Sequence, residues 1–412
     1  MKKIIIIILI VLVIGAVVFL GYYLRSRNES VAPSPPTAEP GNLPTVQLPK
    51  ATGSTQGAGQ ATGPIENLRI AVNVPTIDYF VDAKNSATFV QPDGQILKIG
   101  NSGPEVLSAS IVKNVVRASF SLDGKKVLVV MKESSGDQAS VFDTERKTWR
   151  PLPQNANGPV WSPNNYLIAY FSNVSGGSVL SLLDMANFAS QPKVLLPLHQ
   201  EDMTLNWVAP DQILVADKTS ALWNSFLWSL DLVKKIISPV IQDRPGLETV
   251  WSSSSAPFGL MFSASQNQQG GQLWLVDKSG NALKQLNFLT LPTKCVFYDN
   301  PVGVSAQAPS STATSTSAPT SRETPKTQLV LICAVPRDQQ RLSIAILPDA
   351  YQEKALFTSD DFFEINVNDG GVKTLFSDPV KNLDASTIKI FNQAIFFINR
   401  FDKKVYSVPL SG

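Results

Sequence analysis

One histidine, His199, is the chain's sole imidazole, and it limits the acid-base chemistry that the sequence can support. A Ser-His-Asp triad would have to use His199 as its base, and a metal site built from several histidines is excluded. His199 lies in the sequence PLHQED, and the chain has no G-x-S-x-G nucleophile turn. We therefore expect His199 to be a solvated loop residue rather than a catalytic base.

Two acidic neighbours, Asp360 and Asp361, are a second candidate for a catalytic site, because glycoside hydrolysis uses a pair of carboxyl groups. Adjacent residues of a strand point to opposite faces, so at most one of the two can line a site. Tyr351 and Gln352 lie in an extension between two expected hairpins and could reach the rim of the domain. We treat them as candidate binding residues, with a capping role as the alternative. The sequence predicts no metal and no cofactor, since it lacks P-loop, dinucleotide-binding and EF-hand spacings.

The two cysteines, Cys295 and Cys333, flank a segment rich in Ser, Thr and Pro at about 301–327. If their strands are antiparallel neighbours, the two Cβ atoms can come within bonding distance. An exported domain meets an oxidising compartment, so we predict a disulfide, with two buried thiols as the alternative. The composition of the intervening segment is typical of a disordered surface insert.

The elements that must position these residues follow a repeat. Each copy has a short strand ending in an aromatic residue, then a polar turn and a strongly apolar strand, as in ASFSLDGKKVLVV and GPVWSPNNYLIAYF. The aromatic residues of the four clearest copies are 41, 46 and 44 residues apart. The aromatic residues of all seven copies are Phe80, Phe120, Trp161, Trp207, Trp251, Phe297 and Phe391. We expect them to fill the core between repeats rather than bind a sugar or a base.

A second hairpin follows the first in each copy, so every repeat supplies a four-stranded antiparallel sheet. Sheets of this size arranged radially form a propeller, and the repeat length of about 46 residues agrees with that architecture. The sequence therefore predicts an all-β, seven-bladed β-propeller over residues 67–412. The last repeat has three strands of its own, and residues 67–74 are expected to add the fourth and close the ring.

Several recurring motifs resemble a known family. The FSLDG and WSPN turns, the LWxxD strands and the run TKCVFYDN followed by LICAVP are similar to TolB-like and WD40-like propellers, more closely to the membrane-anchored PD40-type propellers of bacteria. The poor turn in the repeat at Phe297 and the sequence AYQEK depart from that pattern. Such propellers mostly act as interaction platforms, so the resemblance implies binding rather than catalysis.

An uncharged stretch at residues 4–24 precedes the repeats, and as a helix its 21 residues would span about 30 Å of hydrocarbon. A cleavable signal peptide is the alternative, but Arg25 and Arg27 follow without a small-residue cleavage site. We predict a single transmembrane anchor within residues 1–27, with the N-terminus in the cytoplasm and the propeller outside. Residues 28–66 are rich in Pro, Gly and Thr and are expected to be a disordered linker.

The charge of the chain argues against nucleic acid as a partner. Lys and Arg number 35 against 33 Asp and Glu, which leaves a net charge of +2 and no long-range field to attract a polyanion. The sequence thus favours a non-catalytic platform that binds a protein or a surface polymer at the cell envelope. The alternative is a propeller-type lyase or glycosidase with acidic residues at the mouth of the channel.

Overall fold

The computed structural model describes residues 45–46, 48, 68–100, 103–108, 112–134, 136–187, 189–199, 203–253, 258–301 and 327–410. All of them belong to one compact unit, Pro44–Gly412. The expected membrane anchor, most of the expected linker and the interior of the Ser/Thr-rich insert lie outside these ranges. Within them, no helix is both long enough and apolar enough to cross a bilayer.

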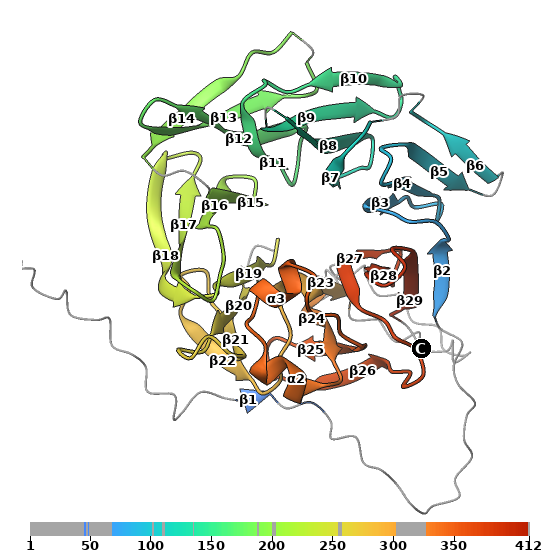
Figure 1. The fold of residues 1–412 in the computed structure, drawn as a ribbon, viewed down its shortest axis with the longest axis vertical. Helices are drawn as coiled ribbons and strands as arrows, with labels where there is room; N and C mark the ends of the chain where they lie inside the picture. The colour runs from blue at the N-terminus through green and yellow to red at the C-terminus, as the bar shows by residue number, and fades with distance from the viewer. Residues whose placement is uncertain are drawn as a thin grey trace, which may run out of the picture. The chain divides into compact units, whose positions relative to one another are not determined.

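The described strands form seven separate sheets arranged around a common centre (Figure 1). Blade 1 contains β3 (Asp78–Val81), β4 (Ala87–Val90), β5 (Ile96–Gly100) and β6 (Gly103–Val106). Blade 2 contains β7 (Val115–Phe120), β8 (Lys126–Glu133), β9 (Gly136–Asp143) and β10 (Thr148–Pro151). Blade 3 contains β11 (Ala156–Trp161), β12 (Leu167–Val174), β13 (Gly177–Asp184) and β14 (Lys193–Leu198). Blade 4 contains β15 (Met203–Ala209), β16 (Gln212–Asp217), β17 (Asn224–Asp231) and β18 (Ile236–Pro245).

The remaining blades carry the additions to the repeat. Blade 5 contains β19 (Glu248–Trp251), β20 (Gly259–Ala264), β21 (Gly271–Val276) and β22 (Ala282–Leu286). Blade 6 begins after the short 3-10 helix η2 (Pro292–Lys294) and contains β23 (Cys295–Pro301), β24 (Thr327–Pro336), β25 (Asp360–Asn366) and β26 (Val372–Phe376). Helices α2 (Gln339–Ile344) and α3 (Asp349–Gln352) form an insert between β24 and β25. Blade 7 contains β27 (Ala385–Phe391), β28 (Ala394–Asn399) and β29 (Val405–Pro409).

Ring closure follows the prediction made for residues 67–74. Strand β2 (Arg69–Val72) pairs antiparallel with β29 and becomes the outer strand of blade 7. Val72 is buried there, and the amide of Thr76 donates to the carbonyl of Lys403 at 2.8 Å. The two ends of the propeller therefore share one sheet, and β2 covers the edge of β29 that would otherwise be open.

Two residues of the expected linker form a β-strand. Strand β1 (Thr45–Val46) pairs in parallel with β22 and adds a fifth strand to blade 5. The outer edge of β22 has unpaired backbone groups, which an extended segment can satisfy regardless of its composition. Composition alone predicted a linker throughout residues 28–66, and at these two residues the available sheet edge overrides it.

The core consists of apolar layers between neighbouring blades. Second strands are buried on both faces because a blade packs on either side, and all six residues of β20 are buried. Six of the seven repeat aromatics pack in these layers, and Trp207 is the most buried of the six. The other five are Phe120, Trp161, Trp251, Phe297 and Phe391. Where blades 7, 1 and 2 meet, the ring of Phe80 contacts those of Phe120 and Phe391, at centroid distances of 6.2 and 5.2 Å.

The Asp-Gly turn between β7 and β8 shows how local chemistry serves the packing. Gly124 has φ +71°, a conformation that L-residues rarely adopt, and a Cβ there would collide with the ring of Phe80. Asp123 accepts from the amide of Lys125 at 3.1 Å and from the Tyr166 hydroxyl of the next blade at 2.6 Å. The turn thus positions two blades as well as one hairpin.

Candidate functional site

A pocket of about 480 Å³ opens on the inner strands of blades 7, 1 and 2. These strands, β27, β3 and β7, are the edge strands that border the centre of the ring (Figure 1). We call this cavity the inner-strand pocket. Its lining residues are Ile77, Asp78, Val116, Arg117, Ala118, Ser119, Phe120, Thr387 and Lys389.

Irregularities in two inner strands shape the pocket. The pairing of β27 with β28 shifts register between Ser386 and Lys389, and Thr387 within the shift has φ +50°. Positive φ is unusual for a β-branched residue and needs support from its surroundings. The Tyr79 hydroxyl provides it by donating to the carbonyl of Thr387 at 2.8 Å. Strand β7 has a similar shift between Val115 and Arg117. Bulges of this kind re-aim the side chains that follow them.

Lys389 places a positive charge at the border of the pocket. Its ammonium donates to Asp78 Oδ1 at 2.6 Å and to the carbonyl of Tyr79 at 2.9 Å. It also lies 5.2 Å from the centroid of the Tyr79 ring, within the range of a cation–π contact. Burial raises the pKa of Asp78, and the Lys389 ammonium opposes that rise. The ion pair therefore makes a buried carboxylate tolerable and fixes the orientation of the lysine.

Arg117 brings a second cation to the pocket from blade 2. One of its terminal nitrogens donates to the carbonyl of Pro159 in blade 3 at 2.8 Å, which holds the side chain across the gap between blades. Burial lowers the pKa of Arg117, and the negative charge of Asp137 opposes that fall. The ion-pair partner of Asp137 is Lys132, at 3.5 Å. The described lining residues thus comprise two cations and one carboxylate, a net charge of +1.

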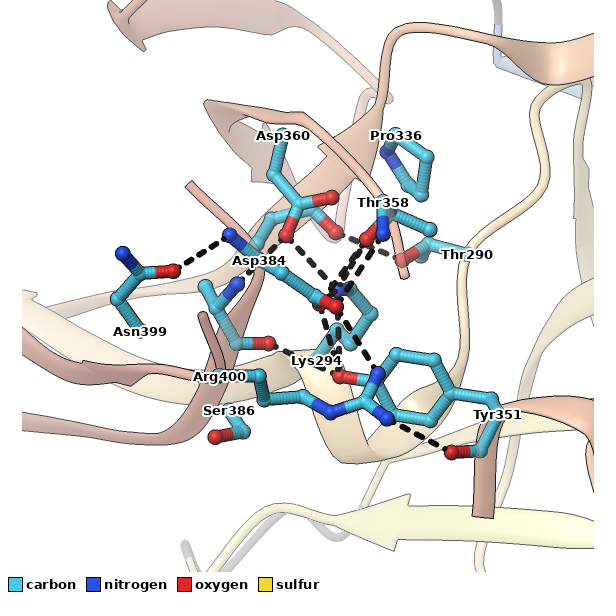
Figure 2. A network of polar contacts seen from close by, with 12 residues as sticks. Thr290, Lys294, Pro336, Tyr351, Thr358, Asp360, Asp384, Ser386, Asn399 and Arg400 are labelled. Carbon is cyan, nitrogen blue, oxygen red and sulfur yellow. Dashed lines mark hydrogen bonds and ion pairs between the residues drawn. The ribbon is translucent and has the colours of Figure 1, made fainter. Parts of the chain in front are cut away.

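A second polar cluster lies buried between blades 6 and 7, centred on Lys294 (Figure 2). Its ammonium is 2.7 Å from Asp360 Oδ2, 2.7 Å from Asp384 Oδ1 and 2.9 Å from the Thr358 hydroxyl. Arg400 donates to Asp384 Oδ2 at 3.0 Å, which balances two carboxylates with two cations. We call this set the buried lysine network.

The charges of the buried lysine network indicate a structural role rather than a catalytic one. Burial alone would lower the pKa of Lys294, but the carboxylates of Asp360 and Asp384 raise it above its usual range. A lysine held in the charged form is neither a nucleophile nor a general base at neutral pH, and only 1 % of this residue is exposed. The network instead ties the start of blade 6 to blade 7, through residues up to 90 positions apart.

The helical insert of blade 6 is held by this network and by blades 4 and 5. The Tyr351 hydroxyl of α3 lies 3.3 Å from the Lys294 ammonium, and Arg400 stacks on the Tyr351 ring at 3.8 Å. The next residue, Gln352, donates to Glu248 Oε1 of blade 5 at 2.7 Å. Asp349 accepts from the amide of Ala221 in blade 4 at 2.7 Å. The insert therefore bridges four consecutive blades.

The two residues predicted to bind at the rim, Tyr351 and Gln352, have different environments in the structure. Tyr351 is 9 % exposed and its ring and hydroxyl are engaged in the buried lysine network, which corresponds to the capping alternative. Gln352 is exposed at the surface of the insert, and a ligand contact for it stays a prediction. His199 is also exposed, at the end of the outer strand of blade 3.

The acidic neighbours and the cysteines lie where strand geometry predicted. Asp360 points into the buried lysine network, whereas Asp361 faces Arg337, with 3.4 Å between Oδ1 and Nε. The two carboxylates therefore do not share a site. Cys295 and Cys333 are directly opposed on β23 and β24, with Cα atoms 4.1 Å apart, and form the predicted disulfide.

The charged residues of the inner-strand pocket escaped the sequence analysis. Asp78 and Lys389 lie within expected strands, and Arg117 directly precedes the repeat copy that begins at Ala118. An isolated charge between apolar residues is the available signal for all three. The buried Lys294 carried a comparable signal, because it directly precedes an apolar strand. Periodicity placed these residues in or next to expected strands, but it could not show which of them converge.

No protein-family model matches the chain, and no curated protein sequence is significantly similar to it. Among solved structures, the tricorn protease matches with a TM-score of 0.47 and 11 % identity over 85 % of this chain and 35 % of that chain. The β-propeller domain of the Trilobed protease from Pyrococcus furiosus matches with a TM-score of 0.48 and 8 % identity over 81 % of this chain and 95 % of that one.

A third match is a catalytically inactive virginiamycin B lyase from Staphylococcus aureus, with a TM-score of 0.49 and 10 % identity over 83 % of this chain and 99 % of that one. This chain spans about a third of the tricorn protease chain and about half of a matching prolyl endopeptidase. At such low identity these likenesses concern the fold alone, which is an all-β propeller of seven blades.

Proposed function

We propose that this protein is a non-catalytic binding platform, anchored in the cell membrane through residues 4–24 and displayed outside the cytoplasm. The observation that carries the proposal is the inner-strand pocket, a cavity that three blades build together and that has charged groups at its border. Rigid scaffolds present binding groups in this way, since blade packing fixes the strands and leaves the inner edges open.

The position outside the cytoplasm is supported by two features of the chain. The Cys295–Cys333 disulfide suits an oxidising compartment, where such bonds persist. The uncharged stretch at residues 4–24 has the length of a membrane span. Because β1 belongs to blade 5, the tether is the part of the linker that precedes it, residues 28–44. As a flexible coil, about 17 residues would hold the propeller on the order of 20 Å from the bilayer.

Affinity capture of the tagged full-length chain from detergent-extracted membranes of its own cells tests the proposal. Wild type and Arg117→Glu are compared with Arg244→Glu, which changes an exposed arginine on the outer strand of blade 4. We expect a partner that is captured by wild type and Arg244→Glu and lost with Arg117→Glu.

Capture that is equal in all three proteins would overturn the proposed role of the pocket. Recovery of a partner polymer that is cleaved during the incubation would instead establish the enzyme alternative. Labelling of an added surface cysteine with an impermeant reagent checks the orientation, because a platform outside the cytoplasm must react in intact cells.

A further inference from the structure

The inner-strand pocket has hydrogen-bond donors to spare. Lys389 directs two bonds to blade 1, to Asp78 and Tyr79, whereas an ammonium has three N–H groups. Arg117 directs one bond to Pro159, although a guanidinium has five N–H groups. Among the described residues, the remaining donors of these two cations have no assigned acceptor. An anionic group in the pocket could accept from both.

Apolar surface lies beside these cations. Val116 is 53 % exposed on β7, next to Arg117, and Ile77 and Phe120 complete an apolar part of the lining. A single exposed valine is ordinary on a protein surface, but this one faces a cavity. Apolar surface in a concave site is typical of ligand pockets, where a few polar groups set the orientation.

The backbone around the pocket adds a third feature. Among the described strands, β27, β3 and β7 are each the terminal strand of a sheet, so backbone groups on their inner edges have no partner strand. The carbonyls of Tyr79 and Thr387 already accept from side chains, and the other edge groups are the ones that a ligand could use. Extended peptides bind to such edges through main-chain hydrogen bonds, with side chains alternating between two directions. A saccharide would use the cations but would gain less from the strand edges and the apolar lining.

We propose that the inner-strand pocket binds an extended peptide segment in which acidic and apolar residues alternate, with a carboxylate against Arg117 and Lys389 and an apolar side chain against Val116. This inference rests on the proposed function and specifies its partner. The net charge of +1 on the lining supplies the complementarity, and a volume of about 480 Å³ accommodates a few side chains rather than a domain.

Fluorescence anisotropy on the full-length protein in mild detergent tests the inference, with a labelled short peptide that alternates Glu and Leu as the probe. A peptide with Gln in place of Glu removes the charge, and one with Ser in place of Leu removes the apolar groups. We expect the Glu/Leu peptide to bind about ten-fold or more tightly than either, and to weaken as salt is raised.

Two protein variants assign the contacts. Arg117→Gln keeps a polar side chain of related length and should weaken the Glu/Leu peptide about ten-fold, while Arg244→Gln should leave it unchanged. Val116→Thr keeps the β-branched shape, so the strand persists, and should weaken Glu/Leu more than Glu/Ser. Circular dichroism of each variant verifies the fold.

Equal binding of the Gln and Glu peptides, or binding that is insensitive to Arg117→Gln, would overturn the inference. Stronger competition by a polyuronate than by the peptide would also overturn it, in favour of an acidic polysaccharide. Failure of the peptides alongside a captured partner that depends on Arg117 would sink this inference and leave the proposed function standing. Peptide binding without a captured partner that depends on Arg117 would support this inference and count against the proposed function.

Discussion

Replacing Glu248 by Gln is expected to stabilise the propeller in a pH-dependent way. Glu248 begins β19, is 8 % exposed, and accepts one hydrogen bond, from Gln352 of the insert. Its second carboxylate oxygen has no hydrogen-bond partner among the described residues. Burial raises the pKa of Glu248 from 4.5 to about 7; the bond from Gln352 opposes the rise and the nearby Asp349 adds to it.

The raised pKa sets both the sign and the size of the effect. The fold favours the neutral carboxyl, so this stabilisation is complete below pH 4.5 and is lost as pH rises through about 7. At 1.36 kcal/mol per pKa unit, the difference between 4.5 and about 7 corresponds to about 3 kcal/mol. A glutamine stays neutral and keeps the bond to Gln352, so Glu248→Gln avoids that loss above pH 7.

Thermal unfolding of the full-length chain between pH 4.5 and 8.5 measures the difference. A propeller of about 340 residues unfolds with an entropy of about 0.7 kcal/mol per degree, so 3 kcal/mol corresponds to a melting-temperature gain of about 4 °C. We expect no gain at pH 4.5 and the full gain at pH 8.5. Glu353→Gln, at an exposed position of the same insert, is the matched control and should show no pH-dependent difference.

Two results would refute this reasoning. A gain that is the same at every pH would mean that the effect is packing rather than charge. A lower melting temperature for Glu248→Gln at pH 8.5 would mean that the ionised carboxylate is stabilised in the fold, contrary to the effect of its burial.

Three further changes test the contacts that hold the ring together. Lys294→Met leaves two buried aspartates short of their shared cation and should cost about 3 to 5 kcal/mol in urea unfolding, whereas Lys381→Met at an exposed loop should cost less than about 0.5. Deleting residues 67–74 removes the outer strand of blade 7 and should lower the melting temperature by at least about 5 °C; an unchanged value would contradict closure through this strand. Gly124→Ala places a methyl group against the ring of Phe80 at a positive φ and should cost about 1 to 3 kcal/mol, and a neutral result would argue against that close approach.

Local patterns were sufficient to predict the blades. Short segments show both the spacing of the aromatic residues and the alternation of apolar strands with polar turns. The same pattern recurs in every repeat. Asp123-Gly124 could be assigned to a turn because a tight hairpin needs a residue with positive φ and glycine adopts one readily. That requirement is local and does not depend on the rest of the fold. The disulfide prediction required the two cysteine strands to be antiparallel neighbours, and β23 and β24 meet that condition.

The candidate site could not be predicted in the same way. Asp78 and Lys389 are 311 positions apart and meet because blade 7 closes against blade 1. The strand shift at Thr387, which accompanies Lys389 at the pocket, depends on a hydrogen bond from Tyr79 in another blade. The repeat pattern places both charges in strands, but a strand position leaves open which neighbour a side chain will meet.

The amino-acid sequence by itself determined the number of blades, the strand that closes the ring and the cysteine pair, because each depends on contacts within a repeat or between its two ends. Only the tertiary structure decided that Lys294 is neutralised by Asp360 and Asp384, and that Arg117 and Lys389 border one cavity. The physical reason is that hydrophobic periodicity fixes the face on which a residue lies, whereas convergence of charges depends on how separate blades are rotated and packed around the centre.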